Sequence, residues 1–169
     1  MIKTISISQI NEAIDDGYEV WIVARSSDNI KNLIDNKRIV WKPHLAPSTL
    51  LLAKANLLKK SNMWNEENWQ NYYVPEFIKE TLGIDHRKAL NELYVASKTK
   101  KIALACFCKD ASHCHRSILI GLMQALQRET EGEDFSYYWL IRRQMEQGTY
   151  TKKIVFPDIP STYTQNTLF

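Results

Sequence analysis

Apolar and polar positions follow one another along the chain in a pattern that predicts alternating strands and helices. Short, nearly continuous apolar runs at 18–24, 39–41, 101–108 and 152–156 are typical of strands buried in a sheet. Before and between these runs, apolar residues recur every three or four positions, which indicates amphipathic helices. The expected helices cover residues 8–16, 29–34, 49–60, 66–82, 85–98, 117–128 and 134–147.

This alternation predicts an α/β fold of three layers, with a mainly parallel central sheet and helices on both faces. The 169 residues favour a single domain, which we place at residues 1–156, followed by a C-terminal tail at 157–169. Pro75 is expected to break or kink the helix at 66–82. In open sheets of this kind, ligands bind beyond the carboxyl ends of the strands. A functional site is therefore expected among the residues that directly follow the strands.

The composition is that of a globular protein, with 44% hydrophobic residues and a formal net charge of +3. The basic residues are scattered, which gives little support for direct nucleic-acid binding. No apolar run is long enough to span a membrane, and the N-terminus lacks the apolar core of a signal peptide, so we expect a cytoplasmic protein without a membrane partner. In that reducing compartment, the three cysteines are expected as thiols or ligands and not as a disulfide framework.

The segment 101–128 concentrates the reactive residues of the chain. All three cysteines and two of the four histidines lie where a predicted strand passes through a short loop into a predicted helix. A helix N-terminus presents free N–H groups and the positive end of the helix dipole. Cys114, His115 and Arg116 at that position suit either an anion site or an activated thiolate.

Four interpretations of this cluster stay open. Cys106 and Cys108 share one face of the predicted strand, so packing in the core accounts for them as well as a site does. The cysteines and His115 are also soft metal ligands, but adjacent Cys114 and His115 are not expected to point at one ion, so we expect no metal and no cofactor. Catalysis would instead use Cys114 or Cys108 as nucleophile and His115 as acid and base.

The fourth interpretation, recognition of a nucleotide or another phosphate-bearing ligand, is preferred. The amides of the predicted helix would hold the anion, together with Arg116 and Ser117. Other residues expected to reach the same ligand are Arg25, Ser26, His44 and Ser48. A base would stack on aromatic residues of the segment 64–73, although aromatic side chains at helical spacing are more often core residues. A module that sequesters or senses a nucleotide without turnover is the alternative to an enzyme.

The strand-loop-helix junction also resembles a known family. Leu104-Ala105-Cys106, followed by Cys114-His115-Arg116, is similar to the signature of the family catalogued as domain of unknown function 488. Softer similarities to one branch of that family are Leu45-Ala46-Pro47-Ser48, Tyr72-Tyr73 and Ile22-Val23-Ala24-Arg25. The resemblance covers roughly residues 18–126 and implies a compact α/β fold. It implies no particular reaction, so the chemistry has to be argued from the residues.

The C-terminal tail carries a separate signal. Gln165, Leu168 and Phe169 stand in the order Gln, two residues, Leu, Phe. This spacing resembles the short peptide by which bacterial replication and repair proteins dock on the DNA sliding clamp. Such a tail places Leu and Phe in an apolar pocket while Gln forms hydrogen bonds at the rim. The alternative is a tail packed on its own domain. A role in DNA repair or modification is a third functional hypothesis, and it depends mainly on these residues.

Deletion of residues 165–169 tests the tail hypothesis. We expect the truncated protein to lose binding to the sliding clamp while its melting temperature stays unchanged, because the anchors Leu168 and Phe169 would be exposed in the free protein. A calorimetric melting scan and a clamp pull-down with both proteins measure the two effects. A loss of roughly 3–5 kcal/mol of stability would instead mean that Phe169 is buried in the protein's own core.

Overall fold

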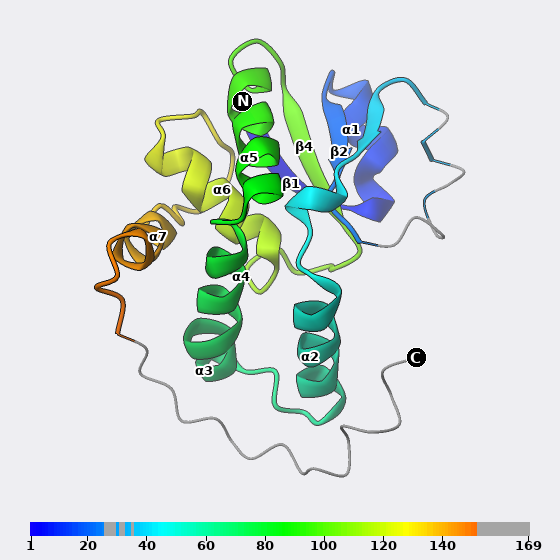
Figure 1. Cartoon of the computed structure of the whole chain (residues 1–169). Coiled ribbons are helices and arrows are strands. Elements are labelled where there is room, and N and C mark those ends of the chain that lie inside the picture. Colours follow the sequence, from blue (N-terminus) through cyan, green and yellow to red (C-terminus); the bar gives the residue numbers. More distant parts are fainter. Residues whose placement is uncertain (26–29, 31–32, 35, 152–169) are drawn as a thin grey trace.

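The computed structural model describes residues 1–25, 30, 33–34 and 36–151 (Figure 1). Within this part of the chain, four strands form one parallel sheet in the order β1-β4-β2-β3. The strands are β1 (Ile2–Ser6), β2 (Glu19–Ile22), β3 (Ile39–Trp41) and β4 (Ile102–Cys106). Because all four run in the same direction, their carboxyl ends meet at one edge of the sheet.

Strand β4 lies at the centre of the fold and is buried on both faces. Its even-numbered residues, among them Leu104 and Cys106, belong to a large core on one side of the sheet. Ala103 and Ala105 point to a smaller core on the other side. Successive side chains of a strand point to opposite faces, so a run of five buried residues requires cover on both. The predicted three-layer α/β fold is thereby confirmed.

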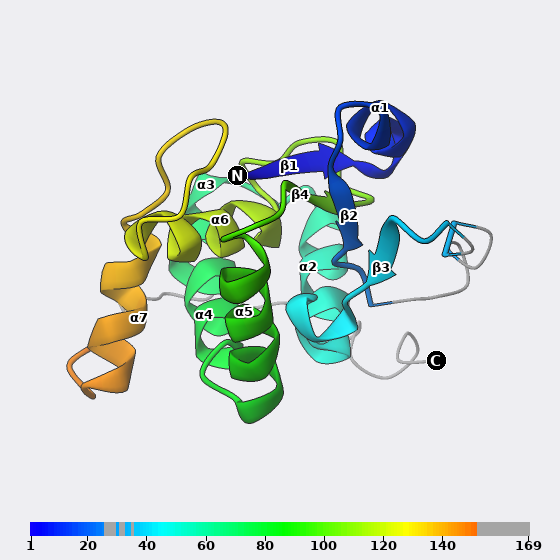
Figure 2. The same ribbon diagram turned by 90° about the horizontal axis from the view of Figure 1, so that it is seen from above.

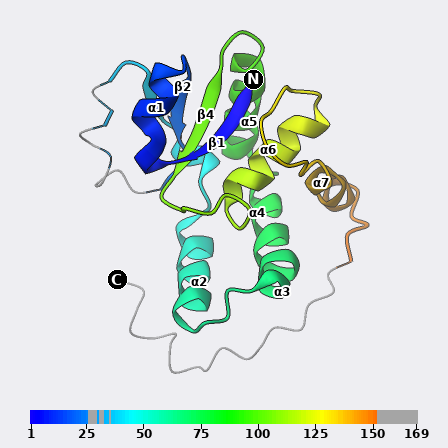
Figure 3. The same ribbon diagram turned by 180° about the vertical axis from the view of Figure 1, so that it is seen from behind.

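The two faces are covered by unequal layers of helices (Figure 2). Helix α1 (Ile10–Asp15) packs on the smaller core with Ile10 and Ala13. The larger core on the opposite face contains residues from most of the other helices. These are α2 (Thr49–Lys60), α4 (Val74–Glu80), α5 (Ile84–Ala96), α6 (His115–Ala125) and α7 (Tyr138–Glu146). Seen from behind, α2 and α4 extend beyond the lower edge of the sheet (Figure 3).

The segment predicted as one helix at 66–82 is divided into three pieces. A single turn, α3 (Glu66–Asn68), leads into a π-helical turn at Trp69–Tyr73, which leads into α4. Pro75 lies in the first turn of α4. Proline has no N–H to donate, and its ring clashes with the carbonyl four residues earlier, so a regular α-helix cannot continue through it. The wider π turn relieves this clash, and the predicted interruption near Pro75 is confirmed.

Strand β1 is the main element that the sequence pattern did not predict. Only Ile2 and Ile5 of its five residues are buried, which is too short a pattern to stand out. The strand forms one edge of the sheet, next to β4. The segment after α6 covers part of this edge, where the Ile2 N–H donates to Glu129 O at 2.8 Å. This contact blocks the addition of a further strand at the start of β1.

The other expected elements agree with the structure to within a few residues where it describes them. The helix predicted at 49–60 coincides with α2. The predicted strand at 152–156, the tail at 157–169 and half of the predicted helix at 29–34 lie outside the described residues. Among the residues that the structure describes, no helix is long and apolar enough to cross a membrane.

Candidate functional site

A cavity of about 410 Å³ opens at the carboxyl edge of the sheet, and we call it the strand-end cavity. Residues 23–25 after β2 and residues 106–108 at the end of β4 form its floor, together with the start of α6. Helix α2 forms one wall through Leu52, Ala55, Asn56 and Lys59. Of the residues expected from the sequence, the cavity brings together Arg25, Cys108, Cys114 and His115.

Cys114 is the residue that immediately precedes helix α6. Its backbone is extended, with φ −135° and ψ 144°, so its side chain turns back over the first turn of the helix. Arg116 Nε donates to Cys114 Sγ at 3.3 Å. Burial opposes ionisation of this thiol, but hydrogen bonds from the thiols of Cys106 and Cys108, and the charge of Arg116, lower the pKa of Cys114 well below its ordinary value.

His115, the first residue of α6, is buried beside that sulfur. Its Nε2 lies 2.7 Å from the carbonyl oxygen of Val23, which can only accept a hydrogen bond. Nε2 therefore carries the proton, and Nδ1 presents a lone pair 3.6 Å from Cys114 Sγ. Burial lowers the pKa of His115 to about 4, so the imidazole is neutral at neutral pH.

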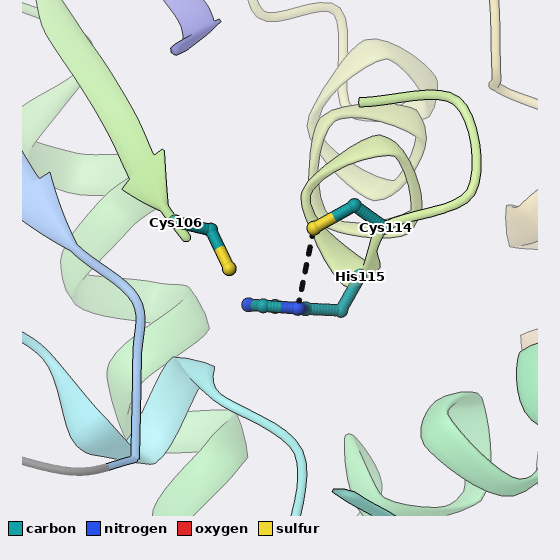
Figure 4. Close-up of side chains that lie close together, drawn as sticks. All are labelled: Cys106, Cys114 and His115. Atoms are coloured by element: carbon teal, nitrogen blue, oxygen red, sulfur yellow. Dashed lines mark hydrogen bonds between the residues drawn. The ribbon is translucent and has the colours of Figure 1, made fainter. Parts of the chain in front are cut away.

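Cys106 completes a cluster with these two residues. The side chains of Cys106, Cys114 and His115 converge from the end of β4 and the start of α6 (Figure 4). One sulfur or nitrogen atom of each lies within 4.8 Å of the others. Hydrogen bonds to the thiols of Cys108 and Cys114, and then burial, raise the pKa of Cys106. The expectation that adjacent Cys114 and His115 point apart is wrong, because Cys114 is extended while His115 is already helical.

Arg116 does not hold an external anion, which corrects the role predicted for it. Its side chain is 1% exposed and points into the protein. The guanidinium donates to the carbonyl oxygens of Ile5, Cys108 and Asp110. Ser117 is also buried, and its hydroxyl donates to Cys114 O at 2.9 Å. The predicted anion site at this helix N-terminus is therefore not formed by Arg116 and Ser117.

Two further candidates, His44 and Ser48, do not line the strand-end cavity. His44 is exposed and lies outside its lining. Ser48 caps α2, because its hydroxyl accepts the Leu51 N–H at 3.1 Å. Ser26 lies outside the described residues. Arg25 does line the cavity, where its guanidinium is held by the carbonyl oxygens of Pro47 and Ala46, each at 3.0 Å.

The positive charge of the cavity comes partly from residues that the sequence did not single out. Lys59 Nζ lies 4.8 Å from the ring centroid of Trp64, and both line the cavity. His113 lies between two carboxylates, with Nε2 2.7 Å from Glu66 and Nδ1 3.3 Å from Asp110. Partial burial opposes the charge, but these carboxylates raise the pKa of His113. The helical spacing of residues 49–60 predicts an amphipathic helix but does not show which of its lysines faces the cavity.

The aromatic residues of 64–73 divide between the core and the cavity. Trp69 and Tyr72 are buried core residues. Tyr73 stacks on Trp69 with ring centroids 5.0 Å apart, and it reaches the cavity from the core. Trp64 is only partly buried and also lines the cavity. Trp64 is thus the aromatic side chain of this group with a partly open face at the site.

The fold and the site together define an α/β protein with a sulfur-rich cavity at the carboxyl edge of a parallel sheet. A family model described as "Active DUF488-N3 subclade" matches residues 2–127. The chain therefore belongs to the family of domain of unknown function 488, as its Cys-His-Arg junction predicts. No curated protein and no solved structure matches it. The matched residues contain all four strands and the start of α6, and so the whole sulfur cluster.

Replacement of Arg116 tests its structural role. We expect Arg116→Ala to destabilise the protein by at least about 3 kcal/mol, because the carbonyl oxygens of Ile5, Cys108 and Asp110 lose a charged donor. Urea unfolding of the wild type and the variant measures the difference. Lys60→Ala, a change at an exposed cation of α2, is the control and should leave the unfolding midpoint in place. Unfolding of Arg116→Ala at the wild-type midpoint would mean that Arg116 is not structural.

Proposed function

We propose that the strand-end cavity binds a nucleotide or a similar phosphate-bearing ligand, and that Cys114 acts on this ligand as a nucleophile. One observation carries the proposal. The Cys114 sulfur, held at the start of α6 by Arg116, lies at the floor of a cavity whose walls combine aromatic and cationic side chains. This combination corresponds to a small organic ligand with one planar part and one anionic part.

The two parts of such a ligand have separate places in the cavity. Trp64 and the apolar side chains of α2 offer a stacking and packing surface for a base. Lys59 and Arg25 supply positive charge for a phosphate group. Arg25 is already oriented by two carbonyl oxygens, so little side-chain entropy is lost when it contacts an anion.

The proposed chemistry uses the atoms beside Cys114. The Cys114 sulfur, which the hydrogen bond from Arg116 Nε stabilises as a thiolate, attacks an electrophilic carbon or phosphorus of the ligand. The bond to the leaving group breaks, and that group departs with the electron pair and takes a proton from water. His115 Nδ1, 3.6 Å from the sulfur, accepts a proton from the water that attacks the covalent intermediate, which releases the second product and restores the thiolate, and His115 then returns this proton to the solvent. The description of the matched subclade as active supports turnover.

Phosphate recognition is tested at Lys59. We expect Lys59→Ala to weaken binding of nucleoside monophosphates about 10- to 100-fold, the scale of one hydrogen bond to a charged group. Titrations with AMP, GMP, CMP and UMP, followed by tryptophan fluorescence, measure this. Lys60→Ala, one residue further along α2 and outside the cavity lining, is the matched control. Equal binding of adenosine and AMP by the wild type would count against a phosphate site.

The nucleophile is tested at Cys114 in protein kept with a reductant and a chelator. We expect Cys114→Ala to bind nucleotides like the wild type but to convert none of them, because the attacking atom is gone. Mass spectrometry of the nucleotide mixture detects conversion. Cys108→Ala, which removes the other thiol considered as nucleophile, should keep turnover. Binding without conversion by the wild type would favour the alternative of a sequestering or sensing module.

A further inference from the structure

We propose that Cys106, Cys114 and His115 form a binding site for one Zn²⁺ ion. This goes beyond the proposed function, because a ligand can occupy the strand-end cavity whether or not the ion is present. All three residues lie within the described part of the chain, at the end of β4 and the start of α6. Two thiolates and an imidazole form a donor set that zinc prefers in proteins.

The positions of the donor atoms match zinc coordination. Bonds of about 2.3 Å to sulfur and about 2.0–2.1 Å to nitrogen place tetrahedral sulfur and nitrogen ligands about 3.6 Å apart. Cys114 Sγ and His115 Nδ1 are 3.6 Å apart. The Cys106 sulfur completes the cluster, in which one donor atom of each residue, with either ring nitrogen counted for His115, lies within 4.8 Å of the others. Closing the three ligands on one ion would then require side-chain rotations and no change in the strand or the helix.

The tautomer of His115 is the one that metal ligation through Nδ1 requires. His115 Nε2 donates to Val23 O at 2.7 Å, so Nδ1 has its lone pair directed toward the sulfur of Cys114. Metal-binding histidines usually donate their other ring N–H to a carbonyl or carboxylate, which fixes the ring. The hydrogen bond from His115 Nε2 to Val23 O involves neither of the two cysteines. Val23 directly follows a different strand, β2.

Charge balance also favours the ion at this buried position. Two thiolates neutralise the two charges of Zn²⁺, so the loaded cluster has no net charge to bury. Arg116 Nε donates to Cys114 Sγ at 3.3 Å, which stabilises that sulfur as a thiolate. The supporting backbone belongs to a central strand and to the first turn of an eleven-residue helix, so the ligands are held by rigid elements.

Three protein ligands leave a fourth position on the cavity side, because Cys106, Cys114 and His115 all line the strand-end cavity. An open position of this kind is typical of catalytic zinc sites. It accepts water or an oxygen atom of the molecule that is bound in the cavity. Cys114 is then a metal ligand, and its sulfur is free to attack only in the metal-free protein. Zinc binding and alkylation of Cys114 should therefore exclude each other.

The test uses the full-length protein, reduced and stripped with a chelator. Titration with Co²⁺ is expected to produce thiolate-to-cobalt charge-transfer absorption that saturates at one equivalent and disappears when Zn²⁺ is added. Zinc should also protect Cys114 from iodoacetamide, as read by peptide mass spectrometry. Cys106→Ser and His115→Gln are expected to weaken zinc binding more than tenfold. Cys108→Ser, the matched control, should change the affinity less than threefold.

Several outcomes would overturn the zinc site. These are no charge-transfer band in the folded wild type, no protection of Cys114 by zinc, or an equal loss of affinity in Cys108→Ser and Cys106→Ser. The first two readouts use the wild type, so a variant that fails to fold does not affect them. Nucleotide titrations in the presence of the chelator test the proposed function separately, because that function does not require the ion.

Discussion

The buried guanidinium of Arg116 links strand β1, the loop after β4 and the start of helix α6 through hydrogen bonds. It donates to the carbonyl oxygen of Ile5 in β1 and to those of Cys108 and Asp110 in the loop after β4. Its Nε donates to the Cys114 sulfur. A buried charge is costly unless its donors are satisfied, so these contacts fix the loop in one conformation. The position of the sulfur at the start of α6 follows from that constraint.

This constraint changes how the Cys-His-Arg motif of the family is understood. The three residues of the motif are adjacent in the sequence, but their side chains have different positions and different contacts. Arg116 points into the protein and holds the loop, whereas Cys114 and His115 turn toward the cavity. Arg25 and Lys59, on other elements, instead bring positive charge to the lining of the cavity. The motif therefore builds the floor of the cavity, and the walls come from segments whose sequences carry much weaker signals.

The sequence predicted those parts of the fold that repeat a simple pattern. Strands β2 to β4 and helix α2 were found because a buried run or a helical period extends over most of each element. Strand β1 was missed because two buried residues in five do not make a pattern. The edge at which the site lies was also predictable, since parallel strands bring the residues after β2 and β4 together.

The orientation of individual side chains was less accessible to sequence reasoning. The Arg116 side chain points into the protein because its guanidinium donates to carbonyl oxygens of β1 and of the loop after β4. A sequence pattern does not show which backbone carbonyl oxygens are available as hydrogen-bond acceptors. Ser48 and Ser117 were assigned to a ligand, but they satisfy the backbone of their own helices. Polar side chains near a helix N-terminus commonly form hydrogen bonds to the backbone of that helix. Only the three-dimensional structure shows which of them face a cavity.

The change from extended to helical backbone between Cys114 and His115 is what gives the sulfur cluster its chemistry. Two adjacent helical residues would point about 100° apart around the helix axis, since 3.6 residues complete a turn. The extended Cys114 turns its sulfur back beside the His115 ring, and the end of β4 places Cys106 opposite both. The same geometry sets a proton acceptor beside a thiol and assembles three metal donors. On the two proposals taken together, a zinc ion would hold Cys114 as a ligand, and the metal-free cluster would leave its thiolate to react.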